Sequence, residues 1–219
     1  LSINGSAIAA SAETDSNGQF TFPSATVTRG DILTLFLNDE TEDAVTITVA
    51  SGSLMMHSIH LYQNRLITRH ETGGTLTSAN LDTANNVGGS GDSDINAIYT
   101  MSSLNTTIVN GKTLYIWTGS TLNLGGTLSV GTSGATSELH LNGSLTQNNN
   151  AITTYGPYTQ SGGTFTGAAL LAGAEQWLAP ILGISYKTAD GSVHSTPRRL
   201  SIADLDALIS LAEVAEKYH

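Results

Sequence analysis

One phrase recurs three times between residues 119 and 167, and it limits the folds that the chain can adopt. The phrase is an alternating stretch, a Gly-Gly or Asn-Gly pair, and then Ser or Thr, Leu or Phe, and Ser or Thr. It stands in GSTLNLGGTLSVG (119–131), SELHLNGSLTQN (137–148) and YTQSGGTFTG (158–167). The glycines at 126, 143 and 163 are 17 and 20 residues apart. This interval is typical of one coil of a three-sided parallel β-helix, in which each repeat supplies one short strand per face.

The residues around these glycines fit stacked coils. Eight short strands are expected between residues 107 and 167, in TIV, TLYIW, TLNL, TLSV, ELHL, SLTQ, PYTQ and TFT. Their alternating Leu, Val and Ile side chains would face a core, and Gly or Asn would take corners of positive φ. Between Gly111 and Gly167 the charged residues are Lys112 and Glu138 alone. We therefore expect a short β-solenoid, a right-handed β-helix, over residues 53–167; a second β-sandwich with Gly-rich hairpins is the alternative.

The first part of that region, residues 53–110, has a mixed pattern. HSIHLYQNRLITRHE (57–71) is expected to form two strands joined at Gln63-Asn64. NVGGSGDSD (86–94) reads as a Gly-rich loop, and INAIYTM and NTTIVNG return to strand character.

Residues 1–52 predict a small Ig-like β-sandwich. TDSNGQFTF (14–22) places a turn before an alternating Phe20/Phe22 strand, which is a hairpin signal. DILTLFLND (31–39) and AVTITVASG (44–52) predict two more strands, with turn signals at the spacing usual for a sandwich.

Two stretches resemble known families of bacterial surface proteins. SAETDSNGQFTFPSATVTRGDILTLFLND resembles transthyretin-like, or carboxypeptidase-regulatory-like, Ig modules, in which a T-D-x-x-G-x-[FY]-x-F hairpin is followed by G-D-x-[IL]. The tandem sequence pattern GxTLxL-GG-TLxV is similar to the repeats of β-helical passengers and adhesin stalks. Together these resemblances imply an adhesin-type surface protein.

Residues 168–219 predict an α-β-β-α region. AALLAGAEQWLAPILG is expected to be a short apolar helix, ISYKTADGSVHS (184–195) a hairpin, and SIADLDALISLAEVAEKYH a longer helix. The order and the S-x-x-D-L helix start resemble the small head–tail joining proteins of tailed phages. The alternative is a helical cap on the open end of the β-helix, because an uncovered last coil exposes its backbone edge and core.

Composition excludes several classes of function. The 18 acidic residues outnumber the 8 Lys and Arg, giving a net charge of −10, so no nucleic-acid partner is expected. No apolar run is long enough to span a membrane. The absence of Cys excludes disulfides, thiolate zinc sites and cysteine nucleophiles. Because the chain starts at Leu1, we expect a mature or excised fragment, and no cofactor other than calcium is expected.

Two kinds of site are candidates. Asp92 and Asp94, in GSGDSD (89–94), could supply calcium ligands, with a solvated acidic turn as the alternative. Tyr115, Trp117, Tyr155 and Tyr158 could contact carbohydrate if exposed, with half-buried packing as the alternative. No catalytic residues are predicted.

The sequence thus predicts a non-enzymatic, extracellular structural or adhesive segment of a larger cell-surface protein or filament. Its partners would be neighbouring copies or modules of the same protein, and carbohydrate. Two alternatives stay open: a virion protein associated with a phage tail or capsid, and a polysaccharide-binding or polysaccharide-cleaving β-helix.

Overall fold

The computed structural model describes residues 1–8, 11–22, 25–52, 56–89, 91–134 and 136–167, together with the backbone of 185–187 and 193–195. The chain divides into two compact units, Leu1–Ala168 and Ala169–His219. In the second unit β17 (Ser185–Lys187) and β18 (Val193–Ser195) pair antiparallel, as expected of a hairpin over 184–195. The two helices expected there lie outside the described residues.

The described part of the first unit is mainly β. Its strands are β1 (Ser2–Ile3), β2 (Ser6–Ala7), β3 (Ile32–Phe36), β4 (Val45–Val49), β5 (Arg65–His70), β6 (Gly74–Thr77), β7 (Tyr99–Ser102), β8 (Asn105–Ile108), β9 (Thr113–Ile116), β10 (Ser120–Asn123), β11 (Leu128–Val130), β12 (Glu138–Leu141), β13 (Ser144–Thr146), β14 (Ile152–Thr154), β15 (Tyr158–Gln160) and β16 (Phe165–Thr166). Its helices are α1 (Ser78–Asn85), the 3-10 turn η1 (Val87–Gly89) and α2 (Ser93–Asn96).

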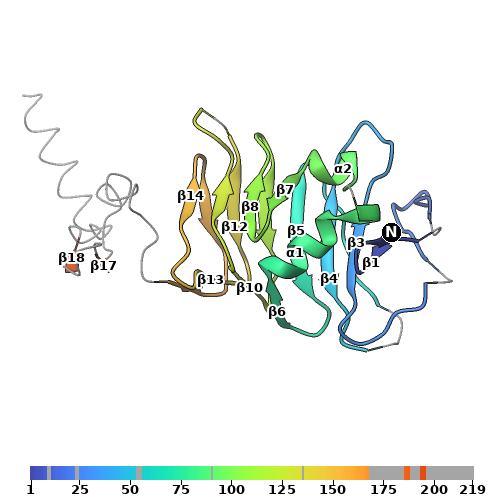
Figure 1. Ribbon diagram of the computed structural model, residues 1–219, viewed down its shortest axis with the longest axis horizontal. Coiled ribbons are helices and arrows are strands. Elements are labelled where there is room, and N and C mark those ends of the chain that lie inside the picture. The colour runs from blue at the N-terminus through green and yellow to red at the C-terminus, as the bar shows by residue number, and fades with distance from the viewer. Residues whose placement is uncertain are drawn as a thin grey trace, which may run out of the picture. The chain divides into compact units, whose positions relative to one another are not determined.

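These strands form three sheets. The first sheet has the order β15-β12-β9-β5-β4-β3-β1-β2, the second β16-β13-β10-β6 and the third β14-β11-β8-β7. The chain visits the sheets in turn: β9, β10 and β11 make one pass, β12, β13 and β14 the next, and β15 and β16 begin another. Strands of successive passes pair in parallel in all three sheets. Figure 1 shows these strands side by side along the first unit.

The registers align apolar side chains between passes. In the first sheet Leu66, Leu114 and Leu139 are partners, and all three are fully buried. In the second sheet the matching ladder is Leu76, Leu122 and Leu145, also fully buried. Because neighbouring parallel strands lie about 4.8 Å apart, each Leu packs directly on its counterpart in the next pass. One core therefore runs through all passes.

The recurring glycines lie where one pass approaches the backbone of the preceding pass. A Cβ at Gly126, Gly143 or Gly163 would collide with the carbonyl oxygen of Leu104, Trp117 or Gly143, respectively. Positive φ, which the sequence suggested for such corners, occurs at Gly163 (φ 63) but not at the other two. The phrase therefore recurs mainly because a side chain would hold neighbouring passes apart.

The strands of residues 1–52 all belong to the first sheet. β4 pairs in parallel with β5, and β3, β1 and β2 follow with antiparallel pairing. The Ig-like sandwich expected here needs two facing sheets, and the described strands of this segment supply one.

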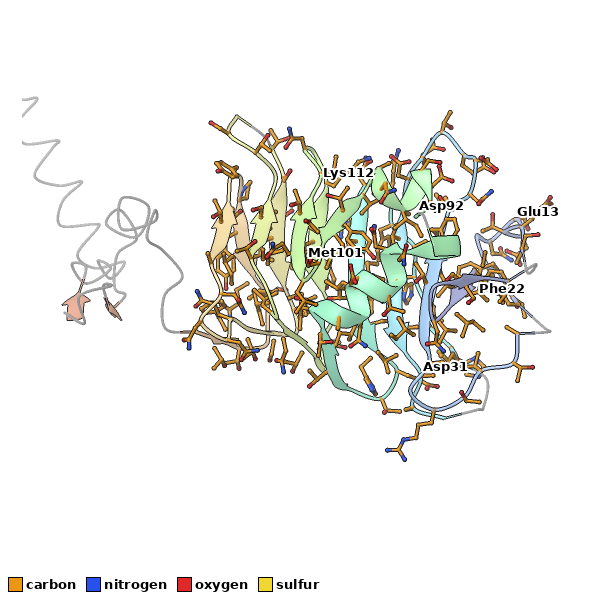
Figure 2. All side chains as sticks on the ribbon, viewed as in Figure 1. Glu13, Phe22, Asp31, Asp92, Met101 and Lys112 are labelled. Atoms are coloured by element: carbon orange, nitrogen blue, oxygen red, sulfur yellow. The ribbon has the colours of Figure 1, made fainter. Side chains whose placement is uncertain are left out.

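The expected turn before Phe20 is present, although no strand is assigned to the described residues 14–22. Asp15 N–H donates to the carbonyl of Gln19 at 2.8 Å, closing the turn. Phe20 and Phe22 pack instead against Leu33 and Leu35, in a second apolar cluster beside β3 (Figure 2).

Helix α1 closes the core at β6 and β7. Thr77 caps it, with the Asn80 side chain accepting from Thr77 N–H at 2.8 Å and Asn80 N–H donating back to Thr77 Oγ1. The helix contacts β3, β6 and β7, which belong to three different sheets, and its Leu81 enters the main core. Since β6 and β7 are the edge strands of their sheets, α1 covers core that would otherwise face water.

Candidate functional site

Aromatic side chains gather on the outer side of the first sheet. Tyr115 in β9 pairs in register with Ile67 of β5 and His140 of β12, and Trp117 follows at the end of β9. In parallel strands, side chains in register point to the same side of the sheet. Leu114 and Ile116 point into the core, so Tyr115 and Trp117 point outward and are half-buried. The structure thus places these two predicted site residues together.

Five rings form a continuous series, which we call the aromatic cluster: Tyr62, His60, Trp117, Tyr115 and His140. His60 is stacked between Tyr62, with ring centroids 5.8 Å apart and planes at 6°, and Trp117, at 5.3 Å and 18°. Tyr115 continues the series to Trp117 at 5.6 Å and to His140 at 4.7 Å, with tilted rings. These distances lie within the range of favourable aromatic pairs.

Arg65, at the start of β5, adds a cation to the aromatic cluster. Its guanidinium carbon lies 5.5 Å from the ring centroid of Tyr62 and 5.9 Å from that of Tyr115. Both distances fall within reach of a cation–π interaction. Arg65 therefore links the two tyrosines at the ends of the Tyr62–His60–Trp117–Tyr115 series.

Hydrogen bonds hold the segment that carries His60 and Tyr62 against the sheet. The Thr46 hydroxyl of β4 donates to the carbonyl of His60, and Arg69 Nη1 donates to the carbonyl of Ser58 at 2.7 Å. Arg69 is buried, and this burial lowers the pKa of its guanidinium. These bonds anchor the backbone of the segment, whose side chains then cover Trp117.

Neutral polar groups border the aromatic cluster. Asn142 Nδ2 donates to the Tyr115 hydroxyl at 3.0 Å, and His140 Nε2 lies 2.9 Å from Ser161 Oγ. One carboxylate is near, since Glu138 Oε1 lies 3.4 Å from His140 Nδ1. The site thus combines aromatic rings, one cation, hydroxyls and amides. Side chains of these kinds occur where proteins bind polar ligands.

Tyr155 and Tyr158 lie apart from the aromatic cluster. Tyr155 follows β14 and is 46% exposed, and Tyr158 in β15 is 37% exposed. Tyr158 is the register partner of Leu139, so it extends the buried Leu ladder by one pass. Partial burial raises the pKa of its phenol, and the hydroxyl donates to Gln160 at 2.8 Å. These two predicted contact residues therefore lie at the turn between β14 and β15 and at the start of the last described pass.

The calcium candidates Asp92 and Asp94 each serve a backbone amide. Asp92 caps α2, and its Oδ1 accepts from Asp94 N–H at 2.9 Å (Figure 2). Asp94 Oδ2 accepts from Asp39 N–H at 2.8 Å. Among the described residues no group of three or more His, Cys, Asp or Glu could hold a metal ion. The Asp92 carboxylate thus caps helix α2, and the Asp94 carboxylate holds the loop that contains Asp39.

Sequence patterns gave only part of this site. Tyr115 and Trp117 were found because they alternate within one strand, and that alternation is local. His60, Tyr62 and Arg65 were missed, because their place beside β9 depends on pairing between segments about 50 residues apart in the chain. The register that pairs Leu114 with Leu139 also pairs Tyr115 with His140, so a correct prediction of this register would have added His140 to the site.

Comparisons with known proteins add no relative. In the part of the chain that the structure describes, no helix has the length and apolar character to cross a membrane. No protein-family model, curated protein or solved structure matches this chain.

Proposed function

We propose that this chain is a non-enzymatic structural and adhesive segment of an extracellular surface protein, built as a short right-handed β-solenoid. The successive passes of β5 to β16 would be its coils. The strands of residues 1–52 and helix α1 would cover its first end. In this proposal the chain acts by shape, presenting long outer faces that contact neighbouring modules or carbohydrate.

The observation that carries the proposal is the common register of the three sheets. Leu114 pairs with Leu139, Leu122 with Leu145 and Leu128 with Ile152, always one pass apart. A sandwich of hairpins would give antiparallel pairing between neighbours in sequence, whereas a solenoid gives parallel pairing between passes. Every pairing among β8 to β16 follows the second rule, in all three sheets, and the antiparallel pair β7–β8 precedes it.

Low charge and a turn-rich surface support a structural role. The outward positions of β9 to β16 are mostly Ser, Thr and Asn, which are polar and uncharged. Lys112 pairs with Asp43 at 2.8 Å, which ties the start of β9 to the loop before β4. The polar face that remains exposed is suited to many weak contacts.

Electron microscopy of the full chain, with calcium or with chelator, tests the structural half of the proposal. We expect rods or end-to-end chains in both conditions, because the carboxylates of Asp92 and Asp94 already accept backbone N–H groups. Rings or closed particles would contradict the proposal and favour a virion component. Rods that dissociate in chelator would support the solenoid architecture and would show that the assembly requires calcium.

A glycan array tests the adhesive half. We expect binding that falls when Tyr62, which is 44% exposed, is changed to Ala. The matched variant is Tyr155→Ala, since Tyr155 is about equally exposed and, in the described part of the chain, its ring makes no contact with the aromatic cluster. An array without hits, or equal loss in both variants, would remove carbohydrate contact by this surface.

A further inference from the structure

Arg65 is a cation without an anionic partner. Among the residues that the structure describes, the ion pairs are Lys112–Asp43 and His140–Glu138, and no hydrogen bond from the Arg65 guanidinium is found. A guanidinium has five N–H donors in a fixed plane. The guanidinium carbon lies 5.5 Å from the ring centroid of Tyr62 and 5.9 Å from that of Tyr115, so two cation–π contacts hold this side chain while its N–H groups have no anionic partner among the described residues.

The other described Lys and Arg side chains lie outside the aromatic cluster or are already paired. Lys112 is paired with Asp43, Arg69 is buried and bonded to the carbonyl of Ser58, and Arg29 is exposed in the turn before β3. Arg65 thus carries an unbalanced positive charge in a chain whose net charge is −10.

The nearest acidic group in the ladder does not neutralise Arg65. Glu138 shares its register position through Thr113, which places it two strands away, or about 10 Å at the usual strand spacing. Its carboxylate is instead 3.4 Å from His140. Arg65 and Glu138 therefore form no ion pair in the described part of the chain.

We propose that the aromatic cluster binds an acidic polysaccharide, with a uronate carboxylate paired to Arg65 and the sugar ring against Tyr62. This inference rests on the proposed adhesive function and names its ligand class. Arginine matches a carboxylate bidentately, and the contacts with Tyr62 and Tyr115 limit the motion of the Arg65 side chain. The neutral donors and acceptors on the border, Asn142, Ser161 and Thr159, suit the hydroxyls of a sugar better than the side chains of an acidic peptide.

The test uses the full chain and pairs of oligosaccharides that differ only in charge. Oligomers of galacturonate, of mannuronate and of hyaluronan are titrated by calorimetry, each beside its methyl ester. We expect at least one acid oligomer to bind, with its ester about tenfold weaker or more, because a hydrogen bond to a charged group is worth about a factor of ten or more. Affinity for the acid form should fall as salt rises, since the contact is partly exposed.

Arg65→Gln keeps the length of the side chain and removes its charge. We expect it to lower affinity for the acid oligomer by about tenfold and to leave the ester unchanged. Arg29→Gln, the same change in charge at an exposed position outside the aromatic cluster, should bind like the wild type. The acid-to-ester ratio of the wild type decides the question even if Arg65→Gln proves unstable.

Equal binding of acid and ester would overturn this inference and leave a neutral-glycan adhesin standing. No binding of any oligomer would overturn this inference, and the glycan array would then decide separately whether the adhesive half of the proposed function stands. An equal loss in Arg29→Gln would show a diffuse charge effect and contradict a site at Arg65. Binding of a glutamate-rich peptide in place of every oligosaccharide would point to a protein partner and reject the glycan.

Discussion

Gly143 shows why a residue without chemistry can be indispensable. It stands where the turn between β12 and β13 meets the preceding pass, and a Cβ there would strike the carbonyl oxygens of Trp117 and Ser120. Its own N–H donates to the carbonyl of Ile116 at 2.8 Å, so the close approach is also bonded. Adding one methyl group must therefore move backbone, which is the costly way to relieve a clash.

We expect Gly143→Ala to lower the free energy of unfolding by about 1–3 kcal/mol or more, as overpacking does in a rigid core. Urea denaturation followed by circular dichroism measures this. Gly52→Ala is the matched control, because a Cβ at Gly52 meets no atom of the described residues within 4 Å and its φ is not positive. It should be neutral or stabilising by up to about 1 kcal/mol. Equal effects of the two substitutions would contradict the close-approach explanation.

Tyr99 gives the chain a definite response to alkaline pH. Its hydroxyl donates to the carbonyl of Leu81 at 2.9 Å, and its complete burial raises the pKa well above the usual value of 10.0. The folded state then holds this proton to higher pH than the unfolded state does. The contribution to stability is fully present below the unfolded pKa and is lost as pH rises above about 10.

Tyr99→Phe should therefore flatten the alkaline loss of stability. At about pH 8 we expect it to be less stable than the wild type by about 1 kcal/mol, because the Leu81 carbonyl loses its buried hydrogen bond. The gap should shrink as pH rises past about 10, the unfolded pKa of tyrosine. Urea unfolding at a series of pH values measures both; a gap that stays constant would show that Tyr99 does not govern the response.

Strands and helices differ in how far the sequence predicts them. All eight strands expected between residues 107 and 167 are present as β8 to β13, β15 and β16, because each carries a two-residue alternation. The additional strand β14 was missed, since Ile152 is its only large apolar residue. Helix α1 was missed because its eight residues include two Asn and one Asp, and Thr77-x-x-Asn80 is a variant of the usual capping box.

The segment before β5 was predicted as a strand and is not one. Residues 57–61 have no assigned secondary structure, and they lie over β4 and β5 through the bonds from Thr46 and Arg69. Ring stacking of His60 and Tyr62 with Trp117 supplements these two bonds. This segment is therefore held by a few side chains rather than by a ladder, and it should open before the sheets do.

Trp117→Ala should speed hydrogen exchange in that segment and in the turn that joins it to β5, and not in the second sheet. The amide of Arg65, bonded to the carbonyl of Tyr62, should exchange about tenfold faster, because losing aromatic pairs and their burial costs of order 1–2 kcal/mol. The amide of Leu145, bonded to Thr164 in the second sheet, should keep its rate. Tyr155→Ala is the control variant, at an exposed ring outside the aromatic cluster. Equal acceleration at both amides would mean that Trp117 supports the whole core and not this segment.

For the molecule as a whole, the repeat period carried more information than any single motif. The spacing of glycines predicted parallel passes, and the aligned Leu ladders of the first and second sheets agree with that expectation. What the period could not predict is how the passes end. The first sheet continues from β4 into β3, β1 and β2 with antiparallel pairing at each step, and helix α1 contacts β6 and β7. The segments that cover the end of a repeat region are not themselves repeats, so the repeat period does not predict their structure.

Disulfide cross-linking tests the proposed solenoid most directly, because the chain has no Cys of its own. Cysteines are placed at outward register partners in each sheet: Thr113 with Glu138, Thr121 with Ser144, and Ser129 with Thr153. The control joins Thr121 to Thr146, two residues out of register on the same face. Partners about 5 Å apart fit a disulfide, whereas the diagonal pair at about 7–8 Å does not.

The solenoid predicts that all three in-register pairs oxidise rapidly in the native chain and that the diagonal pair stays reduced. Mass spectrometry of the non-reduced protein, with and without denaturant, gives the answer. In-register pairs that stay reduced, or a diagonal pair that closes as fast as they do, would contradict stacked coils and favour a different pairing of these strands.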